Sequence, residues 1–140
     1  MTIQTRLIKS QITYLRSSKI PNGELVQTGF GWVEIDGERY ENDVIVHVNG
    51  KITKRKKKLS KEFKEEYGHT PLSDKELDFL KKEKPKVVIV GKGQYGDLPI
   101  TPQALKILDN YDLLVDSTPH ALEIMEKERK KFVAIIHVTC

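Results

Sequence analysis

The sequence predicts an α/β fold with three layers, in which a mixed central sheet joins a parallel β-α-β-α-β half to an N-terminal antiparallel meander. Three observations lead to this class. Strand-like runs at residues 87–90, 113–116 and 132–138 alternate with two helical patterns, as expected when helical crossovers connect parallel strands. Turn dipeptides divide residues 21–51 into short strands. The length is that of one ordinary domain, so we expect residues 1–140 to form a single domain.

The composition is that of a globular protein without membrane spans. Hydrophobic residues make up 38% of the chain and charged residues 31%, and no apolar run approaches the roughly 18 residues that a transmembrane helix needs. We therefore expect no membrane association. The single cysteine, Cys140, permits no internal disulfide, which favours a cytoplasmic protein. We expect no cofactor.

Residues 1–23 contain no acidic residue and several Ser, Thr, Lys and Arg residues, a bias typical of mitochondrial presequences. The simpler interpretation is an N-terminal arm or an extra strand. The alternation along residues 12–16 is too loose to decide between strand and helix. A strand, a helix and an arm therefore stay open for this segment.

The segment of residues 21–51 is dense in dipeptides that tolerate positive φ at the two centres of a tight hairpin. Val33 and Ile35 should lie on one face of the resulting sheet, and Phe30 and Trp32 on the other. Because both faces carry apolar groups, we expect partial cover on both sides. The predicted turns are Asn22-Gly23, Asp36-Gly37 and Asn49-Gly50, and the predicted strands are residues 25–35, 39–48 and 51–54.

Two short helices should follow the meander. Residues 63–67 carry aromatic residues at i, i+4 spacing, which predicts a helical turn that Gly68 ends. Residues 73–76, Ser-Asp-Lys-Glu, form a capping box in front of a second helix whose two leucines share one face. Pro85 stops that helix before the first parallel strand.

The two crossover helices should both begin with Thr-Pro. Thr101-Pro102 and Thr118-Pro119 combine an N-cap residue with a proline in the first turn. The order is then β-α-β-α-β with right-handed crossovers. The residues predicted to face inward are Ala104, Leu105, Leu108 and Tyr111 in the first helix, and Leu122 and Met125 in the second.

The glycines after the first parallel strand have the spacing Gly91-x-Gly93-x-x-Gly96, and Asp116 follows at the end of the next strand. This order resembles a dinucleotide-binding fingerprint. In that fingerprint the third glycine lies at the helix start, whereas here Thr101-Pro102 begins the helix about five residues later. The remaining chain is also short for the usual cofactor domain. We therefore interpret the glycines as a loop.

A more general site is predicted at the carboxyl edge of the parallel strands. Both helix starts direct unpaired N–H groups and positive dipole ends to this edge, and Lys92 and His120 add charge. We expect a pocket for a small anion or a polar metabolite here. The alternative is that Thr-Pro merely starts helices efficiently. The candidate ligand-binding residues are Gly91, Lys92, Gly93, Gln94, Tyr95, Asp116, Ser117 and His120.

Residues 51–61 hold seven basic residues and no acidic one. No aromatic residue is interleaved for stacking on bases, so specific recognition of nucleic acid is not favoured. A solvated strand edge that resists pairing, or a face that docks a partner, explains the run better. The members of this predicted basic patch are Lys54, Arg55, Lys56, Lys57 and Lys58.

The ending His137-Val-Thr-Cys140 suggests a nucleophile pair or half of a metal site. In an extended strand, however, the side chains of His137 and Cys140 point to opposite faces. No second His or Cys cluster completes a zinc site, and a nucleophile-elbow sequence is absent. We therefore assign no catalytic residue and no metal ligand.

Five motifs are informative as a set: Phe30-Gly-x-x-x-Ile-Asp-Gly-x-x-Tyr40, Asp43-Val-Ile45, the basic run of residues 54–61, Val88-Ile-Val-Gly-x-Gly93 and His137-x-x-Cys140. Together they resemble the MTH938-like family, which includes the adipogenesis-associated domain protein of animals and a mitochondrial complex I assembly factor. The resemblance covers about residues 28–140 and leaves residues 1–27 as the arm or extra strand.

The resemblance implies a three-layer fold with a mixed central sheet, no established catalytic activity and, for specialised relatives, a role in assembly or interaction. The basic run and the Asp43 motif are closer to prokaryotic-type members. We therefore expect a non-enzymatic protein of uncharacterised role that contacts an unknown protein partner, with a polar or anionic ligand at the glycine loop. The alternative is a small-molecule enzyme at the same edge, with Lys92, Asp116 and His120 as its polar groups. Oligomeric state, partner identity and ligand identity stay open.

Overall fold

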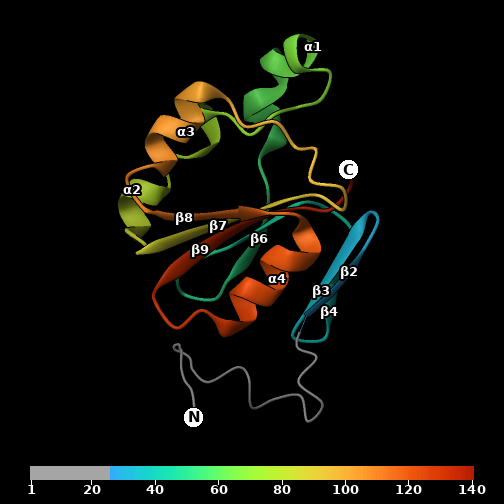
Figure 1. The fold of residues 1–140 in the computed structure, drawn as a ribbon, viewed down its shortest axis with the longest axis vertical. Coiled ribbons are helices and arrows are strands. Elements are labelled where there is room, and N and C mark those ends of the chain that lie inside the picture. The colour runs from blue at the N-terminus through green and yellow to red at the C-terminus, as the bar shows by residue number, and fades with distance from the viewer. Residues whose placement is uncertain (1–25) are drawn as a thin grey trace.

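The computed structural model describes residues 26–140, and the expectations for the N-terminal arm and for the Asn22-Gly23 turn fall on residues 1–25, outside the described part (Figure 1). The fold is a three-layer α/β arrangement around a mixed sheet of five strands in the order β6-β5-β9-β7-β8. The last three strands in this order are mutually parallel, whereas β5 is antiparallel to both β9 and β6. The strands are β5 (Val44–Val46), β6 (Ile52–Lys54), β7 (Val87–Lys92), β8 (Asp112–Asp116) and β9 (Phe132–His137).

A second, antiparallel sheet of three strands corrects the predicted meander. The segment predicted as one strand over residues 25–35 is a hairpin, because the chain turns at Phe30 and Gly31, where Gly31 has a φ of 89°. Phe30 is therefore a turn residue. The predicted strand over residues 39–48 is also divided, since the chain leaves this sheet and enters the central one. The strands of the small sheet are β2 (Val26–Gly29), β3 (Trp32–Ile35) and β4 (Glu38–Tyr40).

The Asp36-Gly37 turn between β3 and β4 is confirmed, with φ values of 52° and 84° at its two centres. The turn before β6 differs in detail. Only Gly50 has a positive φ there, and the His47 N–H bonds to the Lys51 carbonyl, so the glycine forms a bulge beside the turn.

Helices cover the central sheet on both faces (Figure 1). On one face lie the 3-10 helix η3 (Asp74–Glu76), α2 (Leu80–Glu83) and α3 (Pro102–Leu108); on the other lie α4 (Thr118–Lys127) and the three-stranded sheet. The 3-10 helix η2 (Lys57–Phe63) and α1 (Lys64–Tyr67) follow β6, and Gly68 ends α1 in the left-handed conformation, as predicted.

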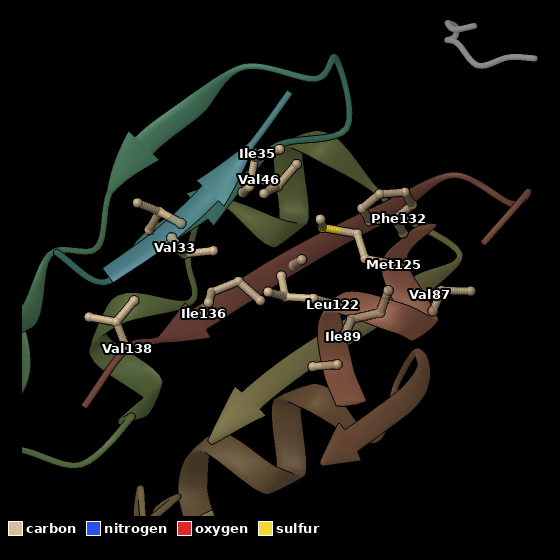
Figure 2. Packing of buried hydrophobic residues seen from close by; sticks show 13 residues of the cluster. Val33, Ile35, Val46, Val87, Ile89, Leu122, Met125, Phe132, Ile136 and Val138 are labelled. Carbon is tan, nitrogen blue, oxygen red and sulfur yellow. The ribbon is translucent and has the colours of Figure 1, made fainter. Parts of the chain in front are cut away.

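Strand alternation divides the apolar side chains of the central sheet between two cores. Figure 2 shows the first core, in which β3 and α4 both pack against β9. The second core lies beneath α2 and α3. Representative members are Val33, Ile89, Leu122, Met125 and Ile136 in the first, and Leu80, Val88, Leu108, Val133 and Ile135 in the second.

The two crossovers place their strands on opposite sides of β7 in the central sheet. From β7 the chain crosses by α3 to β8 on one side, then returns by α4 to β9 on the other side of β7. The two helices lie on opposite faces, as in doubly wound sheets. The topological switch point is therefore between the carboxyl ends of β7 and β9, which is where doubly wound proteins bind ligands.

The two crossover helices bury most of the residues that the sequence predicts to face inward. In α3, Ala104 and Leu108 are buried as predicted, but Leu105 is 40% exposed because this short helix buries only the stripe through the other two. The edge strand β8 is also largely exposed, with Leu114 and Val115 open to solvent. None of the helices within residues 26–140 has the length and apolar character to span a bilayer.

We predict that Leu122→Ala will lower the free energy of unfolding by about 2–5 kcal/mol, because Leu122 is buried between α4 and the sheet and its removal leaves a cavity. Urea unfolding followed by far-UV circular dichroism measures the change. Leu114→Ala is the control. Leu114 is 38% exposed on the edge strand, so a smaller loss at Leu122 than at Leu114 would contradict the packing described.

Candidate functional site

The glycine loop, residues 93–98, lies at the switch point and is bonded to the segment of residues 138–140. The Gln94 N–H donates to the Thr139 carbonyl at 2.6 Å, and the Asp97 N–H donates to the Cys140 carbonyl at 2.9 Å. The Tyr95 N–H also reaches the Cys140 carbonyl, at 3.3 Å. The loop and the segment after β9 therefore form one hydrogen-bonded unit.

The remaining N–H groups of the glycine loop also donate hydrogen bonds to protein acceptors. The Gly93 N–H donates to the Thr118 hydroxyl, the Gly96 N–H to the Gly93 carbonyl and the Leu98 N–H to the Lys92 carbonyl. A phosphate cradle needs several N–H groups that converge on an empty position. Because these groups already have protein acceptors, the loop geometry does not support a phosphate cradle.

Two of the glycines are required by close packing. A Cβ at Gly93 would lie 2.7 Å from the Cys140 carbonyl oxygen and 2.8 Å from the His137 ring, and the φ of Gly93 is +100°. A Cβ at Gly91 would lie 2.9 Å from the Thr118 hydroxyl of α4. Gly96 has a positive φ but open space around it. The glycine spacing thus reflects contact with β9 and α4.

The start of α4 differs from the predicted cap. Ser117 is the N-cap and its side chain makes no capping bond, while Thr118 is the first helical residue. The Thr118 hydroxyl instead accepts from the Gly93 N–H and donates to the His137 carbonyl. Thr118 therefore holds β7 and β9 together at their carboxyl ends. Thr101, by contrast, caps α3 as predicted, accepting from the Ala104 N–H.

The predicted ligand-binding residues come together in part. Parallel pairing places Gly91 opposite Asp116, so the loop and the start of α4 share one edge. Asp116 accepts from the Ser117 N–H at 2.7 Å and lies 3.3 Å from His120 Nδ1. Asp116 and His120 are exposed, and Lys92 is half-buried. Within this cluster, hydrogen bonds join Asp116, Ser117 and His120 to one another.

The predicted basic patch loses one member, because Arg55 is buried. Its guanidinium pairs with Glu76 at 2.7 Å and with Asp43 at 2.9 Å, and donates to the Pro71 carbonyl. Burial alone would lower the pKa of Arg55, but the two carboxylates raise it above its usual value. Lys54, Lys56, Lys57 and Lys58 are exposed.

Glu76 also departs from its predicted role. A capping box predicts that the Glu76 side chain reaches back to the Ser73 backbone. In the structure Glu76 instead points inward, pairs with Arg55 and accepts from the Ser60 hydroxyl. Ser73 still caps η3 through the Lys75 N–H. The glutamate that the sequence predicts as part of a local cap is therefore one partner of a buried ion pair with Arg55.

A buried chain of hydrogen bonds continues from Arg55 to the switch point. Asp43 Oδ2 accepts from His137 Nδ1 at 2.7 Å, and Asp43 Oδ1 accepts from the Val138 N–H at 2.9 Å. His137 Nε2 lies 3.1 Å from the Thr139 hydroxyl. Burial by itself raises the pKa of Asp43, but His137, the Val138 N–H and Arg55 outweigh it and lower this pKa to about 2.

Sequence reasoning missed the Asp43, His137 and Thr139 array. Asp43 and His137 are 94 residues apart, so no local spacing connects them. One signal was available. The alternation that places His137 and Cys140 on opposite faces places Thr139 on the side of His137. Cys140 Sγ instead lies 3.9 Å from His69 Nδ1, and no metal-binding group of three or more His, Cys, Asp or Glu occurs within residues 26–140.

Two solved structures are similar to this chain. The conserved hypothetical protein PH1505 from Pyrococcus horikoshii OT3 is 33% identical, with a TM-score of 0.73, over 82% of this chain and 98% of that one. The protein named MT938 is 34% identical, with a TM-score of 0.68, over 81% of this chain and 96% of that one. A scan against protein-family models and a search of curated proteins found no match.

We predict that Gly93→Ala will destabilise the fold by several kcal/mol more than Gly96→Ala. Both positions have a positive φ, so each substitution carries a backbone cost of about 1–2 kcal/mol. Only at Gly93 does the new methyl group meet Cys140 and His137. Urea midpoints measure both variants, and equal losses would show that the close approach does not constrain the loop.

We also predict that stability falls by about 2 kcal/mol as the pH drops from about 4 to about 2, because of Asp43. The folded-state pKa of Asp43 is lowered from 3.8 to about 2, so its contribution is present above the unfolded pKa and is lost on protonation of the folded state. Urea unfolding from pH 5 to pH 2 measures it. Asp43→Asn should flatten this pH dependence, whereas Asp97→Asn, at an exposed position, should not; an unchanged slope in Asp43→Asn would contradict the assignment.

Proposed function

The chain belongs to the MTH938-like family, and from its own surface we propose that it acts by binding a partner protein through an aromatic face at the switch point. We define the aromatic face by Phe30, in the turn between β2 and β3, and Tyr95, in the glycine loop. The side chains are 60% and 72% exposed, and their ring centroids are 6.3 Å apart. Large aromatic groups left in solvent side by side are typical of interaction sites.

The backbone holds this aromatic face in place. The Gly31 N–H donates to the Val138 carbonyl at 2.8 Å, and the Tyr95 N–H reaches the Cys140 carbonyl. Both loop tips are therefore anchored to the segment that follows β9. Side chains presented by an anchored backbone lose less entropy on binding, and tyrosine is enriched among the residues that dominate binding energy. The anchoring supports a binding role for these two rings.

The remaining lysines of the basic patch fit a protective role better than a polyanion site. Lys54 ends β6, an edge strand of the central sheet, and Lys56, Lys57 and Lys58 follow it on the surface. Charged side chains on an edge strand discourage pairing with another chain. We therefore propose that these lysines have no role in binding nucleic acid. We also propose that the protein is cytoplasmic and that its partner contacts the aromatic face.

A second candidate function is chemistry on a small molecule at the same edge. The observation that favours it is the His137 array, in which one imidazole bonds to both a carboxylate and a hydroxyl. Three polar groups are proposed from the sequence for such a site: Lys92 ends β7, Asp116 ends β8 and His120 lies in the first turn of α4. A small anion or polar metabolite bound there would contact them directly.

We predict that a photo-crosslinking amino acid at position 95 will capture one defined partner in cells that express the protein natively. The same group at position 105 is the control, because Leu105 is also an exposed apolar residue but lies on α3. Phe30→Ala should weaken the purified complex by roughly 30-fold, the effect of losing about 2 kcal/mol at a central aromatic contact. Identical products from both positions, or unchanged affinity in Phe30→Ala, would contradict the proposal.

A further inference from the structure

The hydrogen bonds of His137 define the position of its proton. A carboxylate can only accept, so His137 Nδ1 carries the proton that bonds to Asp43 Oδ2 at 2.7 Å. In the neutral ring, Nε2 is then an acceptor, and the Thr139 hydroxyl at 3.1 Å donates to it. This is the tautomer in which an imidazole can take a proton from a hydroxyl nucleophile.

The carboxylate that orients His137 is itself held on both oxygens. Asp43 Oδ2 also accepts from Arg55 Nη1 at 2.9 Å, and Asp43 Oδ1 accepts from the Val138 N–H. Asp43 and Arg55 are both buried. The lowered pKa of Asp43 agrees with a carboxylate that stays ionised. Asp43 therefore has the surroundings of the third group in a nucleophile, base and carboxylate array.

The array lies where the topology of the sheet favours a site. His137 ends β9 and pairs in register with Lys92 at the end of β7, so the array occupies the switch point between these strands. The missing Cβ of Gly93 leaves room for the His137 ring. Thr139 is half-buried, and the Gln94 N–H fixes its carbonyl. The hydroxyl is thus held on an ordered backbone and is still open to a reactant.

A second array in the same chain provides a comparison. His47 bonds through Nδ1 to Glu83 and through Nε2 to the Thr53 hydroxyl at 2.7 Å. Thr53, however, is exposed in the edge strand β6, at the opposite side of the sheet from β8. Glu83 also binds the Val48 N–H, which joins α2 to the end of β5. The hydrogen-bond pattern is shared, but only the array of Thr139 lies at the switch point.

We propose that Thr139 is a nucleophile for acyl transfer, with His137 as general base and Asp43 as the positioning residue, and that the substrate is an activated acyl compound such as an ester or thioester. This inference does not rest on the proposed partner. Thr139 Oγ1 attacks the acyl carbon while its proton moves to His137 Nε2. The bond to the leaving alcohol or thiol then breaks, and the leaving group takes that proton. Acyl-Thr139 results, and water attack with the same base releases the acid.

The N–H of the residue after Thr139 is available as a donor to the developing oxyanion. In hydroxyl-nucleophile hydrolases the N–H of the residue after the nucleophile supplies part of the oxyanion hole. Here that residue is Cys140, whose N–H donates to no protein acceptor within the described residues, whereas its carbonyl is bound by the loop. Nucleophile, base and oxyanion donor therefore come from one segment, residues 137–140.

The experiment is labelling of the full chain with a fluorophosphonate probe, which reacts with activated hydroxyl nucleophiles, followed by peptide mapping. The background carries Cys140→Ala, which removes the thiol without adding a second hydroxyl beside Thr139. Thr139 should be labelled, Thr139→Ser should keep labelling and Thr139→Val should abolish it. His137→Gln should slow labelling by about 100-fold or more, the usual contribution of a general base.

Controls separate chemistry from folding. Thr53→Val, in the second array, should leave labelling at Thr139 unchanged, and thermal unfolding should show that Thr139→Val remains folded. Asp43→Asn should change the pH dependence of labelling and not only its rate, as expected of a residue that acts through His137. Labelling at Thr139 that is no faster than at Thr53, or that persists unchanged in His137→Gln, would overturn the proposal. The crosslinking outcome at position 95 is independent of either result.

Discussion

The Asp43 carboxylate is the group on which the arrangement of the carboxyl edge of the central sheet depends. It lies just before β5, yet it binds His137 and the Val138 N–H at the end of β9 and the Arg55 guanidinium after β6. Arg55 in turn binds Glu76 in η3. Buried charges of this kind add little net stability, but the loss of one partner leaves another charge unpaired at a cost of about 3–5 kcal/mol. The network therefore specifies how these segments meet more than it strengthens the fold.

The same constraint explains why the glycine loop is not a phosphate loop. With Asp43 holding Val138 in place, the carbonyls of Thr139 and Cys140 face the loop and accept its N–H groups. Gly93 must lack a side chain because the following segment and the His137 ring occupy the space of a Cβ. In a nucleotide-binding fold this space and these N–H groups serve the ligand. Here residues 137–140 fill this space, and the carbonyls of Thr139 and Cys140 accept hydrogen bonds from the loop. The groups at the switch point are therefore side chains and backbone of this segment.

Local sequence patterns predict the elements whose formation depends on residues close together in the sequence. The continuous apolar runs of β7 and β9, the Thr101 cap and the inward stripe of α4 depend on neighbours in sequence, and the structure confirms them. Arg55 was grouped with its basic neighbours and Glu76 with a capping box because each fits a short pattern, although they are partners 21 residues apart. The division of the predicted strand at Phe30 follows from the Gly31 turn, which contains no dipeptide typical of hairpins. The array of Asp43 and His137 needed the sheet order, which no local pattern contains.

Partner binding at the aromatic face and acyl transfer at Thr139 are both proposed at the carboxyl edge of the central sheet. Backbone hydrogen bonds connect the two places. The Phe30 turn is anchored at Val138 and the Tyr95 loop at Cys140, so the aromatic face is attached on either side of Thr139. A partner that packs against both rings would therefore contact two loops that are bonded to the residues on either side of Thr139. Such a partner would exclude water from the Thr139 and His137 pair, which strengthens electrostatic interactions at a reacting centre. It could also deliver the acyl group itself, because a donor bound at the rings is held near the nucleophile instead of arriving by diffusion. Binding and chemistry at this edge are therefore compatible, and the hydrogen bonds around residues 138–140 are what would couple them.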